Sequence, residues 1–305
     1  MALRDSSPGQ PNLRVAVFNF EAGGLRDGRY NFSDLVRARG PVRADLVLLC
    51  EAKGWAGDGR RGLQSALAAL DAETGLPYVG ELAQCDRGPF GPAVLYNPVV
   101  VRLRCWHDAT PATTPDDKRG LGEFELRGSG APFSAVVQHW DPRSLVRRRQ
   151  EAETVDRWGE HPVPVILGGD LNGTASGPHL PHCDWTQQQY VARSHRAVQG
   201  PPGVWTTDTA AVDHLIGRWD PARGERVDGA GFFAVNELAW QSGTPSQEAF
   251  RRTVNSDRGG GLLVDWLLAN RALRDRYVPG TYLVHVPQTQ PHPSDHRLVT
   301  ASFAL

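Results

Sequence analysis

Residues 163–172, VPVILGGDLN, form the sequence feature that constrains this chain most. The apolar run over 163–167 predicts a buried strand, and the two glycines after it leave room for a ligand to approach the backbone. Asp170 and Asn172 then emerge on one face if the chain stays extended. An aspartate there can orient or deprotonate a water, and the asparagine amide can hold the aspartate or an oxyanion. Because a strand with an ordinary Asx turn gives the same pattern, the rest of the chain must decide.

Two apolar segments near the N-terminus also end in polar residues. Residues 13–20 predict a strand that delivers Asn19 and, just beyond it, Glu21, with ordinary turn chemistry as the alternative for both. Residues 45–50, DLVLLC, predict a second buried strand that ends in Glu51. This carboxylate is well placed to ligate a cation, and a salt bridge to a neighbouring lysine is the alternative.

The second half of the chain repeats this arrangement. Residues 133–138 predict a strand that delivers His139. Residues 262–268, LLVDWLL, predict a strand interrupted in its middle by Asp265. A carboxylate inside an apolar strand costs several kcal/mol unless it is paired, so Asp265 needs a partner.

An adjacent aspartate and histidine occur twice. Asp295 and His296 lie in the loop HPSDH, directly before a last predicted strand over 298–305. Asp213 and His214, in AVDHLIG, could imitate the same catalytic pair. The sequence pattern alone does not rank the two pairs.

The remaining segments complete an α/β pattern. Helices are expected over 31–39, 62–74 and 142–158, and strands over 90–96, its hairpin partner 97–104, and 282–286. The third helix is basic, which usually marks a solvated face and alternatively a phosphate contact. Residues 173–261 are rich in Gly, Pro, Gln and His, and we expect an irregular span that is functional or disordered. Its tryptophans could stack on a base, although core packing is their commoner role.

The composition and net charge of the chain limit the kinds of partner that it can bind. The chain of 305 residues has a formal net charge of -1, so no global positive field attracts nucleic acid, and phosphate affinity must be local or come from a metal. Four cysteines without a CxxC pair indicate reduced thiols in a cytoplasmic protein. Residues 1–12 predict a flexible lead-in without a signal peptide. No stretch is apolar enough to span a membrane, and no obligate protein partner is evident.

The polar residues at the predicted strand ends favour a hard divalent cation. They are mostly carboxylates, and the chain contains no HExxH motif and no paired cysteines. Oxygen ligands of this kind point to Mg²⁺ or Mn²⁺ and away from zinc.

Five blocks in order resemble the endonuclease/exonuclease/phosphatase superfamily, which includes DNase I, AP endonucleases, tyrosyl-DNA phosphodiesterase 2, inositol polyphosphate 5-phosphatases and neutral sphingomyelinases. The blocks are VAVFNFE, DLVLLCEAK, VVQHWDP, VILGGDLNGT, and LLVDWLL followed by SDH. Each block is weak alone, and the ordered set is specific. The resemblance implies a four-layer α/β sandwich, with two mixed sheets packed face to face and helices outside. One domain would then cover residues 13–305.

The resemblance also implies metal ligands. Glu51 matches the principal metal carboxylate, Glu21 a second metal-associated acid, and Asp295 an acid that supports the metal site. The family's second strand often ends in Gln-Glu, whereas this chain has Cys50-Glu51, a change that leaves the carboxylate intact.

The remaining positions match catalytic and phosphate-binding roles. By position, Asp170 would orient or deprotonate the attacking water with Asn172 beside it. His296, held by Asp265, would bind the phosphoryl oxygen or act in proton transfer. The family spacing favours this pairing over Asp213-His214. His139 matches a position that is histidine in DNase-like and sphingomyelinase-like members and tyrosine in AP endonucleases, which argues modestly against AP-site repair. Phosphate contacts are implied for four side chains: Asn19, Asn172, His139 and His296.

These inferences together predict a metal-dependent phosphodiesterase, with nucleic acid as the leading substrate. A small phosphate ester is the alternative, and the near-zero net charge slightly favours it because nonspecific DNA binding relies on many basic contacts. A catalytically inactive binding module on the same fold is the third hypothesis. It would have lost one of the matched residues, and none is lost.

Overall fold

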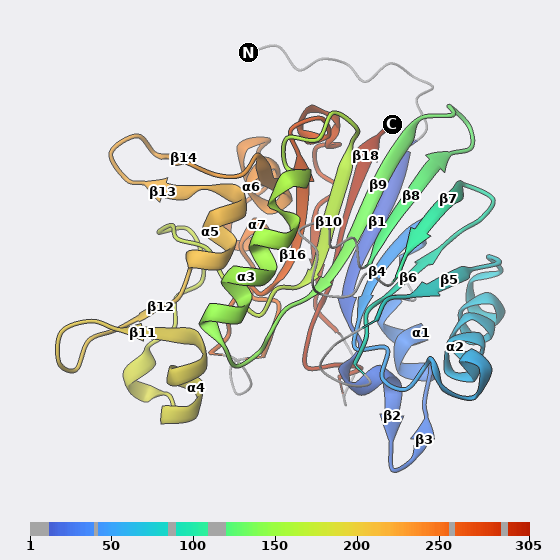
Figure 1. Cartoon of the computed structure of the whole chain (residues 1–305), viewed down its shortest axis with the longest axis horizontal. Coiled ribbons are helices and arrows are strands. Elements are labelled where there is room, and N and C mark those ends of the chain that lie inside the picture. Colours follow the sequence, from blue (N-terminus) through green and yellow to red (C-terminus); the bar gives the residue numbers. More distant parts are fainter. Residues whose placement is uncertain (1–11, 40–41, 85–89, 109–119, 256–259, 288–291) are drawn as a thin grey trace.

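Two six-stranded mixed sheets form the centre of the molecule (Figure 1). The structure, a computed structural model, describes residues 12–39, 42–84, 90–108, 120–255, 260–287 and 292–305. Nearly all of the expected lead-in, residues 1–11, and Cys85 lie outside this part of the chain. The other three cysteines form no disulfide within the described residues.

The first sheet is built around a parallel pair of strands. β1 (Asn12–Asn19) and β4 (Leu46–Cys50) run parallel and place Asn19 opposite Cys50. The sheet order is β17-β18-β1-β4-β6-β5. Its remaining strands are antiparallel: β5 (Val79–Leu82), β6 (Ala93–Tyr96), β17 (Leu283–His285) and β18 (Leu298–Ala304).

The second sheet repeats this plan. β9 (Pro132–His139) and β10 (Val165–Asp170) run parallel and place His139 opposite Asp170. β16 (Asp265–Asn270) pairs antiparallel with β10 and places Asp265 on the other side of Asp170. The order is β15-β16-β10-β9-β8-β7, completed by β7 (Val101–His107), β8 (Leu121–Leu126) and β15 (Phe232–Ala234).

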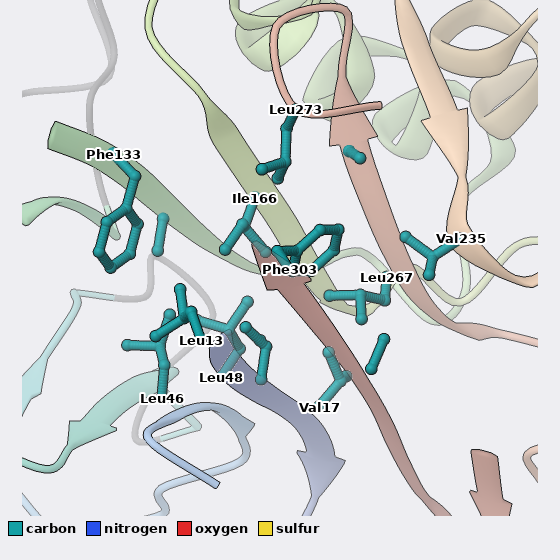
Figure 2. Packing of buried hydrophobic residues seen from close by; sticks show 14 of the residues in the cluster. Leu13, Val17, Leu46, Leu48, Phe133, Ile166, Val235, Leu267, Leu273 and Phe303 are labelled. Carbon is teal, nitrogen blue, oxygen red and sulfur yellow. The ribbon is translucent and has the colours of Figure 1, made fainter. Parts of the chain in front are cut away.

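The two sheets pack face to face through apolar side chains. Val17 and Leu48 of the first sheet belong to the same buried cluster as Ile166 and Leu267 of the second (Figure 2). The glycines after the apolar run serve this packing. A Cβ atom at Gly168 would lie 2.6 Å from Val17 Cγ2 and 2.8 Å from Leu48 Cδ1. The expectation that they leave room for a ligand was therefore wrong, because the opposite sheet fills that room at Gly168 and the Gln138 backbone of β9 fills it at Gly169.

Helices cover both outer faces (Figure 1). On the first sheet these are α1 (Ser33–Arg39) and α2 (Gly57–Thr74), and Leu63 and Leu70 of α2 pack in one cluster with Phe18 and Leu49. On the second sheet, α3 (Leu145–Val155) and α5 (Ala210–Ile216) pack in one cluster with Leu167 and Trp266. The result is the expected four-layer α/β/β/α sandwich.

Three expected elements differ in the structure. Residues 97–104 are not a hairpin partner of β6, because Asn97 Oδ1 accepts the Val99 N–H in a turn and β7 then joins the other sheet. Asp265 begins β16 and does not interrupt a strand. The basic helix begins at Leu145, since Ser144 caps it by accepting the Arg147 N–H. It ends at Val155, and a 3-10 turn, η2 (Asp156–Trp158), follows.

About half of the described residues in 173–261 lie in helices or strands, so the expectation of an irregular span was wrong for that half, while residues 173–184 are irregular as expected. The elements are short, which explains why no periodicity marked them. They include two small hairpins, β11 (Ala197–Gln199) with β12 (Trp205–Thr207) and β13 (Arg218–Asp220) with β14 (Glu225–Val227). The others are η3 (Trp185–Gln187), α4 (Tyr190–Arg196), α5, β15, α6 (Val235–Gln241) and α7 (Ser246–Ala249).

Small elements complete the chain. They are η1 (Glu21–Gly24), β2 (Leu25–Arg26), β3 (Arg29–Tyr30) and η4 (Arg274–Arg276). Within the described ranges, no helix combines the length and the apolar character needed to cross a membrane.

Candidate active site

The polar residues at the strand ends converge at one edge of the sandwich. Asn19 links the two sheets there, because its amide Nδ2 donates to Asp170 Oδ2 at 3.0 Å and to Glu51 Oε1 at 3.3 Å. Two imidazoles approach the same carboxylates. His139 Nε2 lies 3.8 Å from Asp170 Oδ2 and 4.0 Å from Glu51 Oε1, and His296 Nε2 lies 3.7 Å from Asp170 Oδ2. Carboxylates from both sheets therefore share one site.

Asp170 is held as an ionised carboxylate. It accepts from Asn19 Nδ2, from Asn172 Nδ2 at 3.2 Å and from the Asn172 N–H at 2.9 Å. Burial alone would raise its pKa, but His296, His139 and Arg196 outweigh burial and lower the pKa below the ordinary value. Asp170 is thus charged at neutral pH and fixed in direction.

Asn172 turns back onto Asp170 through a left-handed backbone. Its φ is 47°, a conformation that non-glycine residues adopt rarely and mostly where the surroundings impose it. The side-chain Nδ2 also donates to the Trp140 carbonyl at 3.1 Å, and Oδ1 accepts from Arg196 Nη2 at 3.0 Å. Every polar atom of this amide is therefore engaged.

A buried aspartate–histidine pair lies on the other side of Asp170. His296 Nδ1 is 2.8 Å from Asp265 Oδ2, and the backbone N–H of Asp265 donates to Thr253 Oγ1 at 3.0 Å. Burial alone would lower the pKa of His296, but Asp265, Asp170 and Asp295 raise it to about 10. At Asp265 burial prevails and raises the pKa to about 6. Near neutral pH the pair is an imidazolium held by a carboxylate.

The loop before β18 is fixed to the first sheet. Ser294 Oγ donates to the Asn19 carbonyl at 2.8 Å and accepts the His296 N–H at 3.1 Å. This serine therefore sets the position of His296 relative to Asn19. The structure brings Asp265 and His296 together as the spacing implied. Asp213 instead accepts from Ser176 at 2.9 Å.

Cys50 forms hydrogen bonds that connect β4 of the first sheet to the backbone at Asp170. Its Sγ accepts the Asp170 N–H and donates to the Gln138 carbonyl, both at 3.2 Å. Burial, and then the neighbouring Asp170, raises the pKa of this thiol well above its ordinary value, so it stays protonated and able to donate. The departure from the family's Gln-Glu pattern thus provides another bond between the sheets.

The donor set fits a hard cation. Glu51 and Asp295 are the more exposed of the four carboxylates, with side chains 22% exposed, whereas Asp170 and Asp265 are buried. Glu51 adopts a φ of 63° and accepts the Ala22 N–H at 2.7 Å, so its carboxylate is held in place. Asn19 Oδ1 is buried without a hydrogen-bond partner in the described residues. Two carboxylates and a free amide oxygen are ligands that Mg²⁺ or Mn²⁺ accepts.

A second grouping is more compact and fits a cation less well. Ligand atoms of Asp170, Asp265 and His296 all lie within 4.8 Å of one another. However, the Nδ1 atom of His296 is already bonded to Asp265, and the raised pKa keeps the ring protonated. A protonated imidazole does not ligate a metal. The trio is better explained as a hydrogen-bonded network.

Glu21 is placed beside the site and not in the cavity that serves it. It begins η1, and the N–H of the next residue, Ala22, donates to Glu51. Among described residues, those that line the cavity include Glu51 and Asp295 but not Glu21. Its metal-associated role stays a prediction.

A cavity of about 850 Å³ opens over these residues. Its wall contains residues that the sequence did not single out, among them Phe90 and Val254. The basic helix expected over 142–158 pointed to part of this wall, because phosphate contact was one of its two possible roles. Arg143 and Arg147 line the cavity, while Arg148 is buried at 2.8 Å from the His195 carbonyl and Arg149 pairs with Glu153 at 2.9 Å. The full lining is Glu51, Phe90, His139, Asp141, Pro142, Arg143, Ser144, Arg147, Asp170, Asn172, Arg196, Val254, Asp295 and His296.

Solved structures with this architecture cover almost the whole chain. A 3′-5′ exonuclease from Neisseria meningitidis has a TM-score of 0.59 at 15% sequence identity, over 96% of this chain and 100% of the other. The chain has the DNase I-like fold. A humanised zebrafish (D. rerio) TDP2 gives a TM-score of 0.58 at 16% identity over 96% and 99% of the two chains.

An AP endonuclease from Archaeoglobus fulgidus shares the DNase I-like fold, with a TM-score of 0.55 at 15% identity over 96% and 100% of the chains. No family model and no curated protein matches the sequence. At these identities the similarity concerns the fold alone, and the chemistry must be argued from the side chains.

Proposed function

We propose that this protein is a divalent-metal-dependent hydrolase of phosphoric ester bonds. Nucleic acid phosphodiesters are the leading candidate for its substrate. One observation supports the proposal above the others. The Asn19 amide joins Glu51 of one sheet to Asp170 of the other, and both imidazoles lie within 4.0 Å of Asp170 or Glu51. Such a set combines a cation site, a water-orienting carboxylate and positive charge for a phosphoryl group.

Glu51, Asp295 and the Asn19 Oδ1 atom would hold the metal. A bound Mg²⁺ or Mn²⁺ supplies Lewis-acid neutralisation of the charge that develops on a phosphoryl oxygen. Two of these three groups are carboxylates that border the cavity, so a hydrated cation can reach them without unfolding the site.

Asp170 orients the attacking water in this proposal. Its three hydrogen bonds fix the carboxylate, and its lowered pKa favours directing the water over abstracting its proton early. Asn172 keeps the carboxylate from rotating, because its backbone and side chain both donate to it.

His296 and His139 stabilise negative charge on the phosphoryl group. His296 carries its proton at neutral pH because Asp265 holds Nδ1, which leaves Nε2 to donate toward the cavity. His139 lines the same cavity from β9, where it lies directly opposite Asp170 of the neighbouring strand β10.

A small phosphate ester is the second candidate substrate. The formal net charge of -1 favours it, because nonspecific nucleic acid binding relies on many basic contacts. The cavity of about 850 Å³ is also within the range of small-molecule sites.

A substrate panel tests the proposal. Purified protein is assayed with Mg²⁺, Mn²⁺ or EDTA on single- and double-stranded DNA, RNA, 5′-adducted DNA, nucleotides, inositol phosphates and a phospholipid. We expect metal-dependent hydrolysis of at least one phosphate ester, and a loss of at least about 100-fold in turnover for Asp170→Asn. The control is Asp156→Asn, which removes only a surface bond to His214. Activity that persists in EDTA, or in Asp170→Asn, contradicts the proposal.

A further inference from the structure

We infer that Arg196 is a substrate-binding residue that contacts a non-bridging phosphoryl oxygen. This inference rests on the proposed function for the identity of the anion, and on geometry for the existence of the site. Arg196 is the last residue of α4 and lines the same cavity as Asp170, Asn172 and His296. It comes from the span 173–261, which we expected to be functional or disordered, but no sequence pattern pointed to Arg196 itself.

The guanidinium of Arg196 has unused hydrogen-bonding capacity. Its Nη2 atom donates to Asn172 Oδ1, a neutral amide oxygen, and its Nη1 atom is buried without a partner within the described residues. Among the described residues, no carboxylate forms an ion pair with Arg196. A buried guanidinium donor without a hydrogen-bond partner is costly, and an anion in the cavity would supply that partner.

Three nearby carboxylates stabilise the positive charge of Arg196 from a distance, without forming an ion pair with it. Burial lowers the pKa of Arg196, while Asp170, Asp265 and Asp295 raise it. An arginine remains protonated under these conditions. The charge is therefore permanent, and it faces the carboxylates that the proposed function assigns to the metal and the water.

Arg148 shows what a structural arginine looks like in this chain. It is buried as well, but it donates to the Asp141 carbonyl at 3.0 Å and to the His195 carbonyl at 2.8 Å, and it pairs with Asp208 at 3.5 Å. Its role is to hold α4 against α3. Although Arg148 Nε also lacks a partner within the described residues, Arg148 has two carbonyl acceptors and an ion pair, whereas Arg196 has one bond, to a neutral amide oxygen, and no ion pair there. This difference separates a structural role from a ligand-binding one.

The backbone around Arg196 is fixed on both sides. The preceding carbonyl, that of His195, accepts from Arg148, and the Arg196 carbonyl accepts the Asp208 N–H at 2.9 Å. The next residue, Ala197, begins the β11–β12 hairpin opposite Thr207. The guanidinium is thus presented to the cavity from a rigid position, as an anion site requires.

Arg196 also determines how Asn172 is oriented. A guanidinium can only donate, so the carbonyl oxygen of the Asn172 amide must face it. The amide nitrogen must then face Asp170 and the Trp140 carbonyl. A test must therefore separate contact with the anion from an effect passed through Asn172.

Phosphate binding to the Mg²⁺-loaded full-length protein provides that test. Isothermal titration with inorganic phosphate compares wild type with Arg196→Gln, Arg196→Lys and the control Arg193→Gln. Arg193 lies on the same helix and stacks over Trp205, with 5.5 Å from its Cζ atom to the ring centroid. We expect Kd to rise at least about tenfold for Arg196→Gln, because a charge-assisted hydrogen bond is lost. Arg196→Lys should lie between the two, since lysine keeps the charge but not the planar fork, and Arg193→Gln should match wild type.

A double-mutant comparison isolates the contact. In an Asn172→Ala background, Arg196→Gln should still weaken phosphate binding about tenfold if the guanidinium touches the anion. If it acts only through Asn172, the second substitution has no further effect and the inference is overturned. Thermal unfolding of each variant confirms that it is folded. If Arg196→Gln does not fold, Arg196→Lys with wild-type phosphate affinity overturns the inference.

The outcomes also separate the inference from the proposed function. Turnover of a phosphate ester together with unchanged phosphate affinity in Arg196→Gln refutes the inference alone. Phosphate binding that depends on Arg196, without hydrolysis of any ester by wild type, supports the inference and refutes the function. If wild type binds no phosphate at concentrations of about 10 mM, an affinity of only about 3 kcal/mol, the cavity is not an anion site and the inference fails.

Discussion

At the scale of single residues, the site depends on how buried charges are compensated. Asp170 receives three hydrogen bonds, whereas Asp265 receives most of its compensation from one imidazole. The pKa values follow this difference, lowered for Asp170 despite burial and raised to about 6 for Asp265 because burial prevails. Two carboxylates that face each other in register on β10 and β16 thus acquire different chemistry.

The His296–Asp265 pair predicts a specific pH dependence of stability. The pKa of His296 is raised from 6.5 to about 10, so the folded state binds its proton more tightly than the unfolded chain. This contribution is complete below pH 6.5 and is lost as the pH rises toward about 10. The raised pKa of Asp265 acts below about pH 6 and leaves this range unaffected.

Asp265→Asn should therefore reduce the alkaline loss of stability. Urea unfolding at about pH 7 and about pH 9.5 should show a smaller fall in unfolding free energy for the variant than for wild type, whatever its stability at pH 7. The control is His285→Gln, because burial lowers the pKa of His285 and it titrates below this range. Equal slopes in wild type and Asp265→Asn would show that the pair does not carry the effect.

At the scale of elements, β10 carries both the packing and the chemistry. Gly168 and Gly169 allow the opposite sheet and β9 to approach, and Asp170 follows at once. The close approach is what brings Asn19 of β1 within hydrogen-bond distance of Asp170. The strand sequence therefore specifies the distance between the sheets and, through it, the width of the site.

Gly168→Ala tests this dependence. The added Cβ would meet Val17 Cγ2 at 2.6 Å and Leu48 Cδ1 at 2.8 Å, so the sheets must separate or the side chains must shift. We expect a loss of about 1–3 kcal/mol in unfolding free energy from overpacking, measured by urea denaturation. Gly57→Ala is the control, because no atom lies within 4 Å of the Cβ it would add. A change below about 0.5 kcal/mol in Gly168→Ala would mean that the interface is not tightly packed there.

Local sequence predicted the central elements because their signals are local. Apolar runs that end in Asn19, Glu51, His139 and Asp170 identified β1, β4, β9 and β10, since buried parallel strands are continuous apolar segments. The turn at Asn97, which sends β7 to the other sheet, has no such signal. A change of sheet is decided by tertiary packing.

The same limit applies to the candidate site. Eight of the residues that the family resemblance named lie in one cluster in the structure, and Glu21 lies beside that cluster. Arg196 was missed because it ends a seven-residue helix that has no buried face and no periodic pattern. Its significance arises from two contacts distant in sequence, the bond to Asn172 and the anchor of α4 on Arg148. Sequence spacing cannot reveal such contacts.

At the scale of the whole molecule, charge separates the two candidate substrate classes. The formal net charge is -1, and three arginines, Arg143, Arg147 and Arg196, line the cavity. Each phosphate that a basic residue neutralises contributes about -0.7 to -0.9 to the slope of log affinity against log salt concentration. Three such residues set a modest upper bound on the salt dependence of nucleic acid binding.

We therefore expect a slope no steeper than about -3 for a single-stranded oligonucleotide, and a smaller slope for a compact phosphate ester. Fluorescence anisotropy with Asp170→Asn and Mg²⁺, over a series of salt concentrations, measures binding without cleavage. Arg147→Gln should make the slope shallower by about one unit at most, since it removes one contact. Arg104→Gln is the control, because Arg104 lies on β7 and pairs with Glu125 at 3.3 Å. A slope near -6 would require basic contacts well beyond the cavity. The substrate would then be a long nucleic acid that follows the surface, and the cavity would contact only part of it.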